Sequence, residues 1–335
     1  KMLSNFAGDI ENQYDINPEE LNHGSFGYVN EGYRKSDHKH VAVKTLIDDL
    51  IDMDLSISLL RELQILANIK HPKCLQLLAF SLDPPPKIVT PFMAHGSLEQ
   101  HIHKLNRGKP DKAFTPTKMM CALYGICSTM QFLHDKSIIH RDFKPANVFL
   151  DENYDICIAD FGLSRKVEEN LFLTRANIGS PIYMAPELFT EDYKTYTNKI
   201  DVFSFGVSYL QFFGHLTALD DGLGKIQDEE DLYTRVGDGA RFLKPKGASD
   251  EQYQIYIRCC DNNPDLRPSF KELCDIFETQ KGLWFKGVDE EEYKEYIENC
   301  KEIDKSFLAS PASSTKPAPV SKSKTKHKRY DLNAS

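Results

Sequence analysis

The amino-acid sequence predicts an α+β fold, in which a strand-rich region with one helix comes first and a larger, mainly helical region follows. Short apolar runs at residues 41–43, 74–80 and 88–90 are typical of strands. Between the first two runs, residues 55–70 carry leucines at helical spacing. From Ser97 onward the helical pattern dominates, which separates the two regions.

The predicted helices are located by their apolar residues. Asp54 is a suitable N-cap for the helix at residues 55–70. Residues 117–135 and 198–215 are the longest helical candidates, and the second is apolar nearly all round, which predicts a buried central helix. Residues 289–307 are acidic but carry one apolar stripe, so we expect this helix to pack on the preceding region; the stripe consists of Tyr293, Ile297, Cys300, Ile303 and Phe307.

The composition excludes several classes of protein. The 335 residues carry a net charge of −9, which argues against nucleic-acid binding. No run approaches the roughly 18 apolar residues that predict a membrane span. The eight cysteines include no Cys-x-x-Cys pair, which predicts neither a zinc site nor a disulfide frame and favours a cytoplasmic location. The composition of residues 310–335 predicts a disordered tail. Its basic run at 322–329 is a nuclear signal, a contact for an anionic surface or an ordinary solvated segment.

Two neighbouring polar motifs predict phosphate chemistry. Residues 140–145 read His-Arg-Asp-Phe-Lys-Pro, Asn147 follows, and Asp160-Phe161-Gly162 lies downstream. Asp142 is a candidate proton acceptor. Asn147 and Asp160 are candidate Mg²⁺ ligands, because this metal prefers oxygen. A loop turn made of Asp and Asn is the alternative for either motif alone.

A glycine-rich segment between two strand candidates predicts a loop that approaches phosphate groups. Gly24 and Gly27 fit the second and third positions of a G-x-G-x-x-G pattern, whereas Asn22 occupies the first. Glycine permits close approach of the backbone because it has no Cβ. Asparagine is among the other residues that best tolerate unusual dihedral angles. A plain hairpin turn is the alternative.

In combination, these motifs resemble those of a eukaryotic protein kinase over roughly residues 14–284, and in detail those of the tyrosine-kinase-like group of serine/threonine kinases. The resemblance rests on Val41-Ala42-Val43-Lys44, Glu62, His140-Arg141-Asp142, Lys144, Asn147, the segments 160–165, 179–187 and 201–207, and Arg267. It implies a two-lobed protein kinase fold, with a small antiparallel-sheet N-lobe containing one helix and a larger, mainly helical C-lobe.

The resemblance also implies domain boundaries. An N-terminal extension (1–13) precedes the kinase domain (14–285), which divides into an N-lobe (14–90), a hinge (91–96) and a C-lobe (97–285); an acidic helical extension (286–309) and the disordered basic tail (310–335) follow.

ATP and Mg²⁺ are the cofactors that the resemblance implies, and Asn147 and Asp160 are the implied metal ligands. The implied catalytic residues are Asp142, Lys144, Lys44 and Glu62. Asp142 would accept or orient the substrate hydroxyl, and Lys144 would neutralise charge on the transferred group. Lys44 would hold the α- and β-phosphates and pair with Glu62. The implied nucleotide-binding residues are Leu21, Gly24, Ser25, Phe26, Gly27, Val29, Ala42, Lys44, Thr90, Pro91, Met93 and Phe149.

Further residues have implied roles in adenine binding and in support of the fold. The Pro91 carbonyl and the Met93 amide would bond the adenine edge beside the gatekeeper Thr90; an edge strand ended by proline is the alternative. The ring would be sandwiched by Val29, Ala42 and Phe149. The structural roles are a hydrophobic column of His140, Phe161, Leu66 and Leu77, and a buried ion pair between Glu187 and Arg267.

Lys144 and Ser180 make the sequence similar to kinases that phosphorylate serine and threonine, so we expect protein substrates with these acceptors. Thr174 is a candidate phosphorylation site for an upstream activating kinase, with Arg141 and Arg165 as the phosphate pocket, or else an ordinary loop residue. The rival functions are a pseudokinase scaffold, favoured by Asn22, and a small-molecule phosphotransferase.

Overall fold

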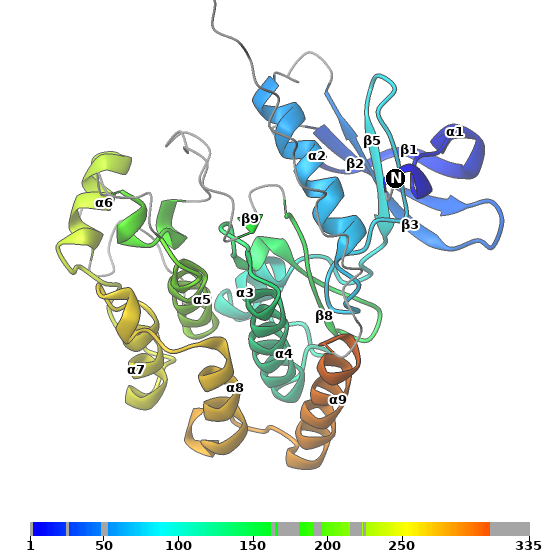
Figure 1. Ribbon diagram of the computed structural model, residues 1–335. Helices are drawn as coiled ribbons and strands as arrows, with labels where there is room; N and C mark the ends of the chain where they lie inside the picture. Colours follow the sequence, from blue (N-terminus) through cyan, green and yellow to red (C-terminus); the bar gives the residue numbers. More distant parts are fainter. Residues whose placement is uncertain are drawn as a thin grey trace, which may run out of the picture.

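The computed structural model describes residues 3–24, 27–47, 53–161, 165–166, 181–189, 196–214, 223 and 226–308, without the side chains of 53–58, 61–62 and 165–166. Two lobes are evident, a sheet lobe and a helical lobe (Figure 1). The sheet lobe contains α1 (Ile10–Gln13), β1 (Tyr14–Gly24), β2 (Gly27–Arg34), β3 (His40–Leu46), α2 (Met53–Asn68), β4 (Ala79–Ser81) and β5 (Lys87–Pro91). The α+β, two-lobed kinase fold predicted from the sequence is therefore confirmed.

The five strands form one antiparallel sheet in the order β1-β2-β3-β5-β4. Alternating side chains of a strand point to opposite faces, and β3 follows this rule: Val41 and Val43 are fully buried, whereas Ala42 and Lys44 are half-buried. The first face is covered by α1 and the start of β1 in a small apolar cluster of Ile10, Tyr14, Val41, Val43, Ala79 and Val89. This cover leaves the other face of β3 available for the functional site.

The helical lobe is built around α4 and α5. Its elements are α3 (Leu98–Asn106), α4 (Pro116–Asp135), β6 (Ile138–Ile139), β7 (Val148–Leu150), β8 (Ile156–Ile158), β9 (Arg165–Lys166), α5 (Lys199–Leu210), α6 (Glu229–Gly237), α7 (Asp250–Cys259), α8 (Phe270–Thr279) and α9 (Glu290–Leu308). Short 3₁₀ turns lie at Leu3–Asn5, Pro145–Asn147, Pro181–Tyr183, Pro186–Leu188, Gln211–Phe213, Pro264–Leu266 and Lys281–Leu283. The start of α4 is fixed by Thr115, whose side chain accepts a hydrogen bond from the Lys118 amide, and by Pro116 in the first turn.

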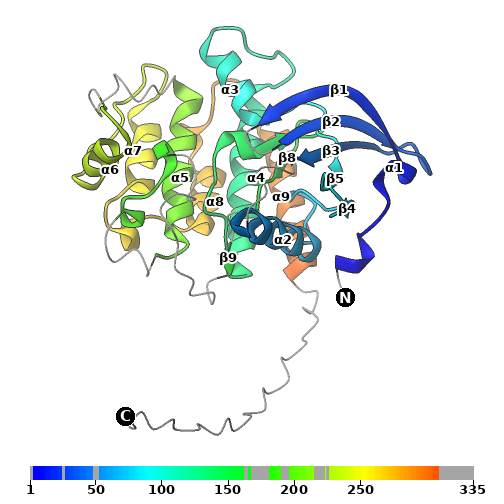
Figure 2. The same cartoon turned by 90° about the horizontal axis from the view of Figure 1, so that it is seen from above.

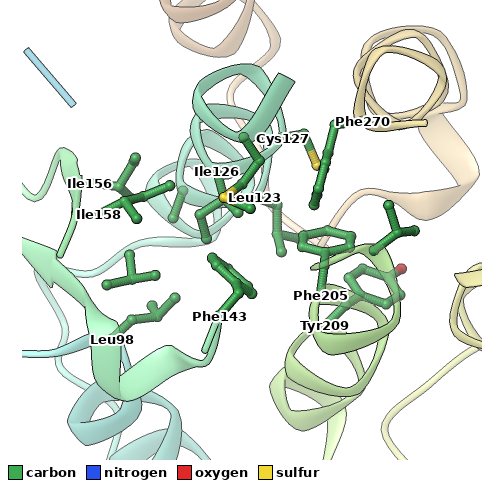
Figure 3. Close-up of a cluster of buried hydrophobic side chains, with 14 of the residues drawn as sticks. Leu98, Leu123, Ile126, Cys127, Phe143, Ile156, Ile158, Phe205, Tyr209 and Phe270 are labelled. Atoms are coloured by element: carbon green, nitrogen blue, oxygen red, sulfur yellow. The ribbon is translucent and has the colours of Figure 1, made fainter. Parts of the chain in front are cut away.

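Aromatic residues fill the space between α4, α5 and α8 (Figure 3). Phe205 of α5 lies 6.3 Å from Phe143 and 5.6 Å from Phe270, measured between ring centroids. Each such side chain contributes about 1.5–3 kcal/mol by burial. Residues 200–210 of α5 are all buried, as expected for a central helix.

The acidic C-terminal helix α9 packs along α4 (Figures 1 and 2). Tyr293, Ile297 and Cys300 of its apolar stripe are buried, and Ile303 and Phe307 are half-buried. The helix begins after Asp289, whose Oδ1 accepts hydrogen bonds from the amides of Glu291 and Glu292 at 3.0 Å. This packing is what the stripe in the sequence predicts.

Three expectations about secondary structure are wrong in detail. The strand predicted at 74–80 is only β4, Ala79–Ser81, with an isolated bridge from Cys74 to Ile158, so Cys74 joins the helical lobe instead. The helix predicted over 198–215 ends at Leu210 and tightens into a 3₁₀ turn. Asp54 lies inside α2, not at its N-cap, because the helix already includes Met53.

Candidate functional site

The β7–β8 hairpin brings the two predicted metal ligands to the same end of the structure. Val148, directly after Asn147, pairs with Ile158, which lies two residues before Asp160. The Asn147 carbonyl accepts a hydrogen bond from the Ala159 amide at 2.8 Å. Asp160 is exposed and has a φ of 61°, a left-handed conformation that Asp and Asn tolerate better than most residues. An amide oxygen and a carboxylate here fit the oxygen donors that Mg²⁺ prefers.

Asp142 lies beside these ligands in a hydrogen-bonded cluster. Its Oδ2 accepts bonds from Lys144 Nζ at 2.8 Å and from Asn147 Nδ2 at 3.1 Å. Asn147 Nδ2 also donates to the Asp142 backbone carbonyl at 2.8 Å. The amide thus fixes both the backbone and the carboxylate of Asp142. The structure therefore brings together Asp142, Lys144, Asn147 and Asp160.

A buried carboxylate anchors the loop that carries Asp142. Asp201 of α5 accepts hydrogen bonds from the amide of His140 at 2.9 Å, from the amide of Arg141 at 2.8 Å and from His134 Nε2 at 2.9 Å. Arg141 has a φ of 73°, a strained conformation that these bonds help to hold. Asp201 was recognised in the sequence only as part of the kinase resemblance. The sequence does carry a signal for this anchoring role, because Asp201 is the one acidic residue in the mainly apolar helix α5.

Replacing Asp201 by Asn is expected to lower the free energy of unfolding by about 3 kcal/mol, because an amide nitrogen cannot accept these bonds. Burial alone would raise the pKa of Asp201, but the His134 hydrogen bond and charge and the Arg141 amide bring it below its ordinary value of 3.8. The pKa of Asp201 is thus lower in the folded protein than in the unfolded chain, where it is about 3.9. Ionised Asp201 therefore stabilises the fold at higher pH, and this stabilisation is lost as the pH falls below that value. The difference in melting temperature between the two proteins should therefore shrink as the pH falls below about 4; a difference that does not change with pH would contradict this expectation.

His140 is part of the packing and not of the polar cluster. Its ring lies 5.2 Å from that of Phe161 between centroids, and its Nε2 bonds the Ala159 carbonyl at 3.0 Å. His140, Phe161, Leu66 and Leu77 are all buried. The contact between the two rings, which are tilted at 48°, agrees with the hydrophobic column that the sequence resemblance implies, and Leu66, Leu77 and Phe161 belong to the same core cluster.

The strand register places the predicted nucleotide-binding residues of the sheet on one face. Lys44 pairs with Val29, and Ala42 pairs with Thr90, so these four side chains lie on the same face. All four are half-buried, as are Pro91, Met93 and Phe149. Glu62 lies on α2, but its side chain is outside the described residues, so its pairing with Lys44 stays a prediction.

The glycine-rich segment forms the β1–β2 hairpin. Gly24 pairs with Gly27, and Asn22 pairs with Val29; Leu21 is exposed on β1. The intervening Ser25 and Phe26 lie outside the described residues. A Cβ at Gly27 would lie 2.1 Å from the Thr45 carbonyl oxygen. Gly27 is therefore required by the close approach of β2 and β3, independently of any contact with phosphate.

The predicted ion pair between Glu187 and Arg267 is present and bidentate. Arg267 Nη1 and Nη2 donate to the two Glu187 carboxylate oxygens at 2.6 and 2.8 Å. Arg267 is 1% exposed, and it also donates to the carbonyls of Asp261 and Lys199. The pair fixes the turn around Glu187 to the helical lobe.

Most of the residues with a predicted regulatory role lie outside the described part of the chain. Thr174, Ser180 and Gly162 lie outside the described residues, as does the side chain of Arg165. Arg141 is buried. Within the part of the chain that the structure describes, no helix is long and apolar enough to cross a membrane, and no three His, Cys, Asp or Glu side chains group as a metal site.

Known proteins match this chain along most of its length. A family model described as "Protein tyrosine and serine/threonine kinase" matches residues 16–277. The chain is 32% identical over 261 residues to the tyrosine-protein kinase transforming protein Abl of Abelson murine leukemia virus, covering 77% of this chain and 33% of that protein. It is 33% identical to the human tyrosine-protein kinase ABL2, covering 77% and 21%. With the human cytoplasmic tyrosine-protein kinase BMX the identity is 29%, covering 77% and 36%. The chain thus spans about a fifth to a third of these relatives.

The expectation of serine/threonine specificity is wrong, because these relatives are named tyrosine-protein kinases. In the structure Lys144 pairs with Asp142, and Ser180 lies outside the described residues, so neither residue outweighs the relatives. The match over residues 16–277 and the two-lobed fold agree with each other. The chain belongs to the protein tyrosine and serine/threonine kinase family.

Proposed function

We propose that this chain transfers the γ-phosphate of Mg²⁺-bound ATP to tyrosine hydroxyls of proteins. The observation that carries the proposal is the cluster of Asp142, Lys144, Asn147 and Asp160 at one end of the β7–β8 hairpin. Phosphoryl transfer depends on positioning and charge stabilisation, and this cluster offers a base, a cation and two metal ligands.

The proposed roles divide between the lobes. Asp142 receives or orients the acceptor hydroxyl, and Lys144 offsets negative charge on the transferred group. Asn147 and Asp160 hold Mg²⁺, which would neutralise charge on the phosphates when bound. Lys44 binds the α- and β-phosphates and pairs with Glu62. The nucleotide lies against the sheet face of Val29 and its neighbours Ala42 and Thr90, with Pro91, Met93 and Phe149 around the base.

Tyrosine as the acceptor rests on the relatives, whose names describe tyrosine-protein kinases. Protein substrates and an upstream activating kinase acting on Thr174 are part of the same proposal. A cytoplasmic location is supported by the name of BMX. The basic run at 322–329, a candidate nuclear signal, lies outside the described residues.

Three peptides that share one flanking sequence and differ only in a central Tyr, Ser or Phe test the acceptor. With Mg²⁺ and radiolabelled ATP, we expect label on the Tyr peptide at least tenfold above the Phe peptide, because a hydroxyl is required and the relatives act on tyrosine. The products are separated and counted. Label confined to the Ser peptide would refute tyrosine as the acceptor, and label on none of the three would refute the proposed transfer to peptides.

A further inference from the structure

The helix α9 begins 13 residues after the end of the family match at residue 277, and it makes polar contacts to the start of β8 as well as apolar contacts to α4. It packs along α4, and its polar side chains contact His71 and Lys73 in the turn that follows α2. These contacts could stabilise the fold, and they could also fix the position of β8 and Asp160.

Lys73, in the turn after α2, is a buried cation with two partners. Its side chain is 5% exposed and forms an ion pair with Asp155. Its Nζ also lies 3.1 Å from Tyr296 Oη of α9 and 4.6 Å from the centroid of that ring. Tyr296 Oη in turn donates to Asp155 Oδ1 at 2.6 Å. Burial, with the nearby Cys300 and Asp155, raises the pKa of Tyr296, so the hydroxyl remains a donor. Lys73, Asp155 and Tyr296 therefore form a closed triad.

The triad holds the strand that leads to Asp160. Asp155 directly precedes β8, and Asp160 follows the strand by two residues. The Ile158 amide donates to the Lys73 carbonyl at 2.8 Å, and the Leu75 amide donates to the Ile158 carbonyl at 2.8 Å. Lys73 thus contacts β8 at both ends, through its ammonium at Asp155 and through its backbone at Ile158.

The central helix α4 has a glycine where Tyr296 must fit. A Cβ on Gly125 would lie 2.4 Å from Tyr296 Oη and 3.1 Å from Ile156 Cγ1. Glycine within a helix costs roughly 1 kcal/mol relative to alanine. The low helix propensity of Gly125 is therefore tolerated at the point where a larger residue would collide with the Tyr296 hydroxyl.

A second contact of α9 fixes the same turn. Asp304 Oδ1 lies 3.0 Å from His71 Nε2, and its Oδ2 accepts a hydrogen bond from Ser128 of α4. Phe307 packs on the His71 ring with centroids 5.7 Å apart. The helix thus links the turn after α2 to α4 and β8 at two places, Tyr296 and Asp304.

We infer that Tyr296 is a positioning residue for the kinase reaction: acting through Asp155 and Lys73, it sets the position of β8 and hence of Asp160. The inference rests on the proposed function, in which Asp160 is a magnesium ligand. The helix α9 then contributes to the kinase reaction by positioning Asp160.

Tyr296→Phe tests this inference because it keeps the ring and removes only the hydroxyl. The probe is the Mg²⁺ concentration for half-maximal binding of a fluorescent ATP analogue, which we expect to rise about fivefold through the loss of one hydrogen bond. Hydrogen exchange of the Ile158 amide should also accelerate. Gly125→Ala should reproduce both effects by displacing Tyr296 from α4. Lys294→Ala, on an exposed part of α9 where the lysine pairs only with Glu290 among the described residues, should change neither.

The outcomes separate the inference from the proposed function. If the intact protein binds the analogue and Tyr296→Phe lowers only the melting temperature, the helix has a structural role and the inference is overturned. If the intact protein binds no Mg²⁺–nucleotide, both the proposed function and the inference are refuted.

Discussion

Replacing Asp142 by Asn is expected to lower kcat about a thousandfold while leaving ATP binding nearly unchanged. An amide cannot take up the proton of the acceptor hydroxyl. The replacement should fold, because Asn has the same shape and its carbonyl oxygen can accept from Lys144 Nζ and Asn147 Nδ2 as Oδ2 does now. Steady-state kinetics and a nucleotide-binding titration measure the two effects separately.

Glu152→Gln is the matched control for Asp142→Asn. Glu152 is an exposed carboxylate in the turn between β7 and β8, on the hairpin that is flanked by the proposed metal ligands. The Glu152→Gln variant should leave kcat unchanged. Full activity of the Asp142 variant would show that this carboxylate has no part in the transfer.

Replacing Arg267 by Met is expected to lower the free energy of unfolding by about 3–5 kcal/mol. The change leaves the Glu187 carboxylate without its bidentate partner and removes donors from the Asp261 and Lys199 carbonyls. Met has a similar length, so the loss reports the charge more than a cavity. Denaturant unfolding of the purified protein gives the value.

A second change at Glu187 separates the ion pair from packing. The double variant Glu187→Gln with Arg267→Met no longer has an uncompensated charge, so it should regain part of the lost stability. If the two changes add without compensation, the destabilisation comes from packing and not from the unpaired carboxylate.

The sequence allowed the helices with a clear apolar pattern to be predicted well. The stripe of Tyr293 and Ile297 gave both the extent of α9 and its packing. Residues 74–80 were misassigned because apolar content alone does not distinguish a strand from a buried connection. There, the chain pairs with Ile158 by a single bridge, which depends on tertiary contact.

The site was predictable where one motif carries the chemistry, and not where distant residues meet. Asp142, Asn147 and Asp160 lie in short motifs, and the order of these motifs in the chain is the basis for the roles proposed for them. The triad of Lys73, Asp155 and Tyr296 joins residues up to 223 positions apart, and no local pattern links them. The acceptor was mispredicted because it was inferred from Lys144 and Ser180 alone, whereas the matching relatives are named tyrosine-protein kinases.

The most direct test of the proposed kinase reaction is transfer of radiolabelled γ-phosphate by the intact protein, with Mg²⁺ and after chelation with EDTA. We expect label on the tyrosine peptide that requires Mg²⁺ and disappears with EDTA, because Asn147 and Asp160 are proposed to act through the metal. Nucleotide binding without any transfer would contradict the account and identify the chain as a scaffold that retains the kinase fold.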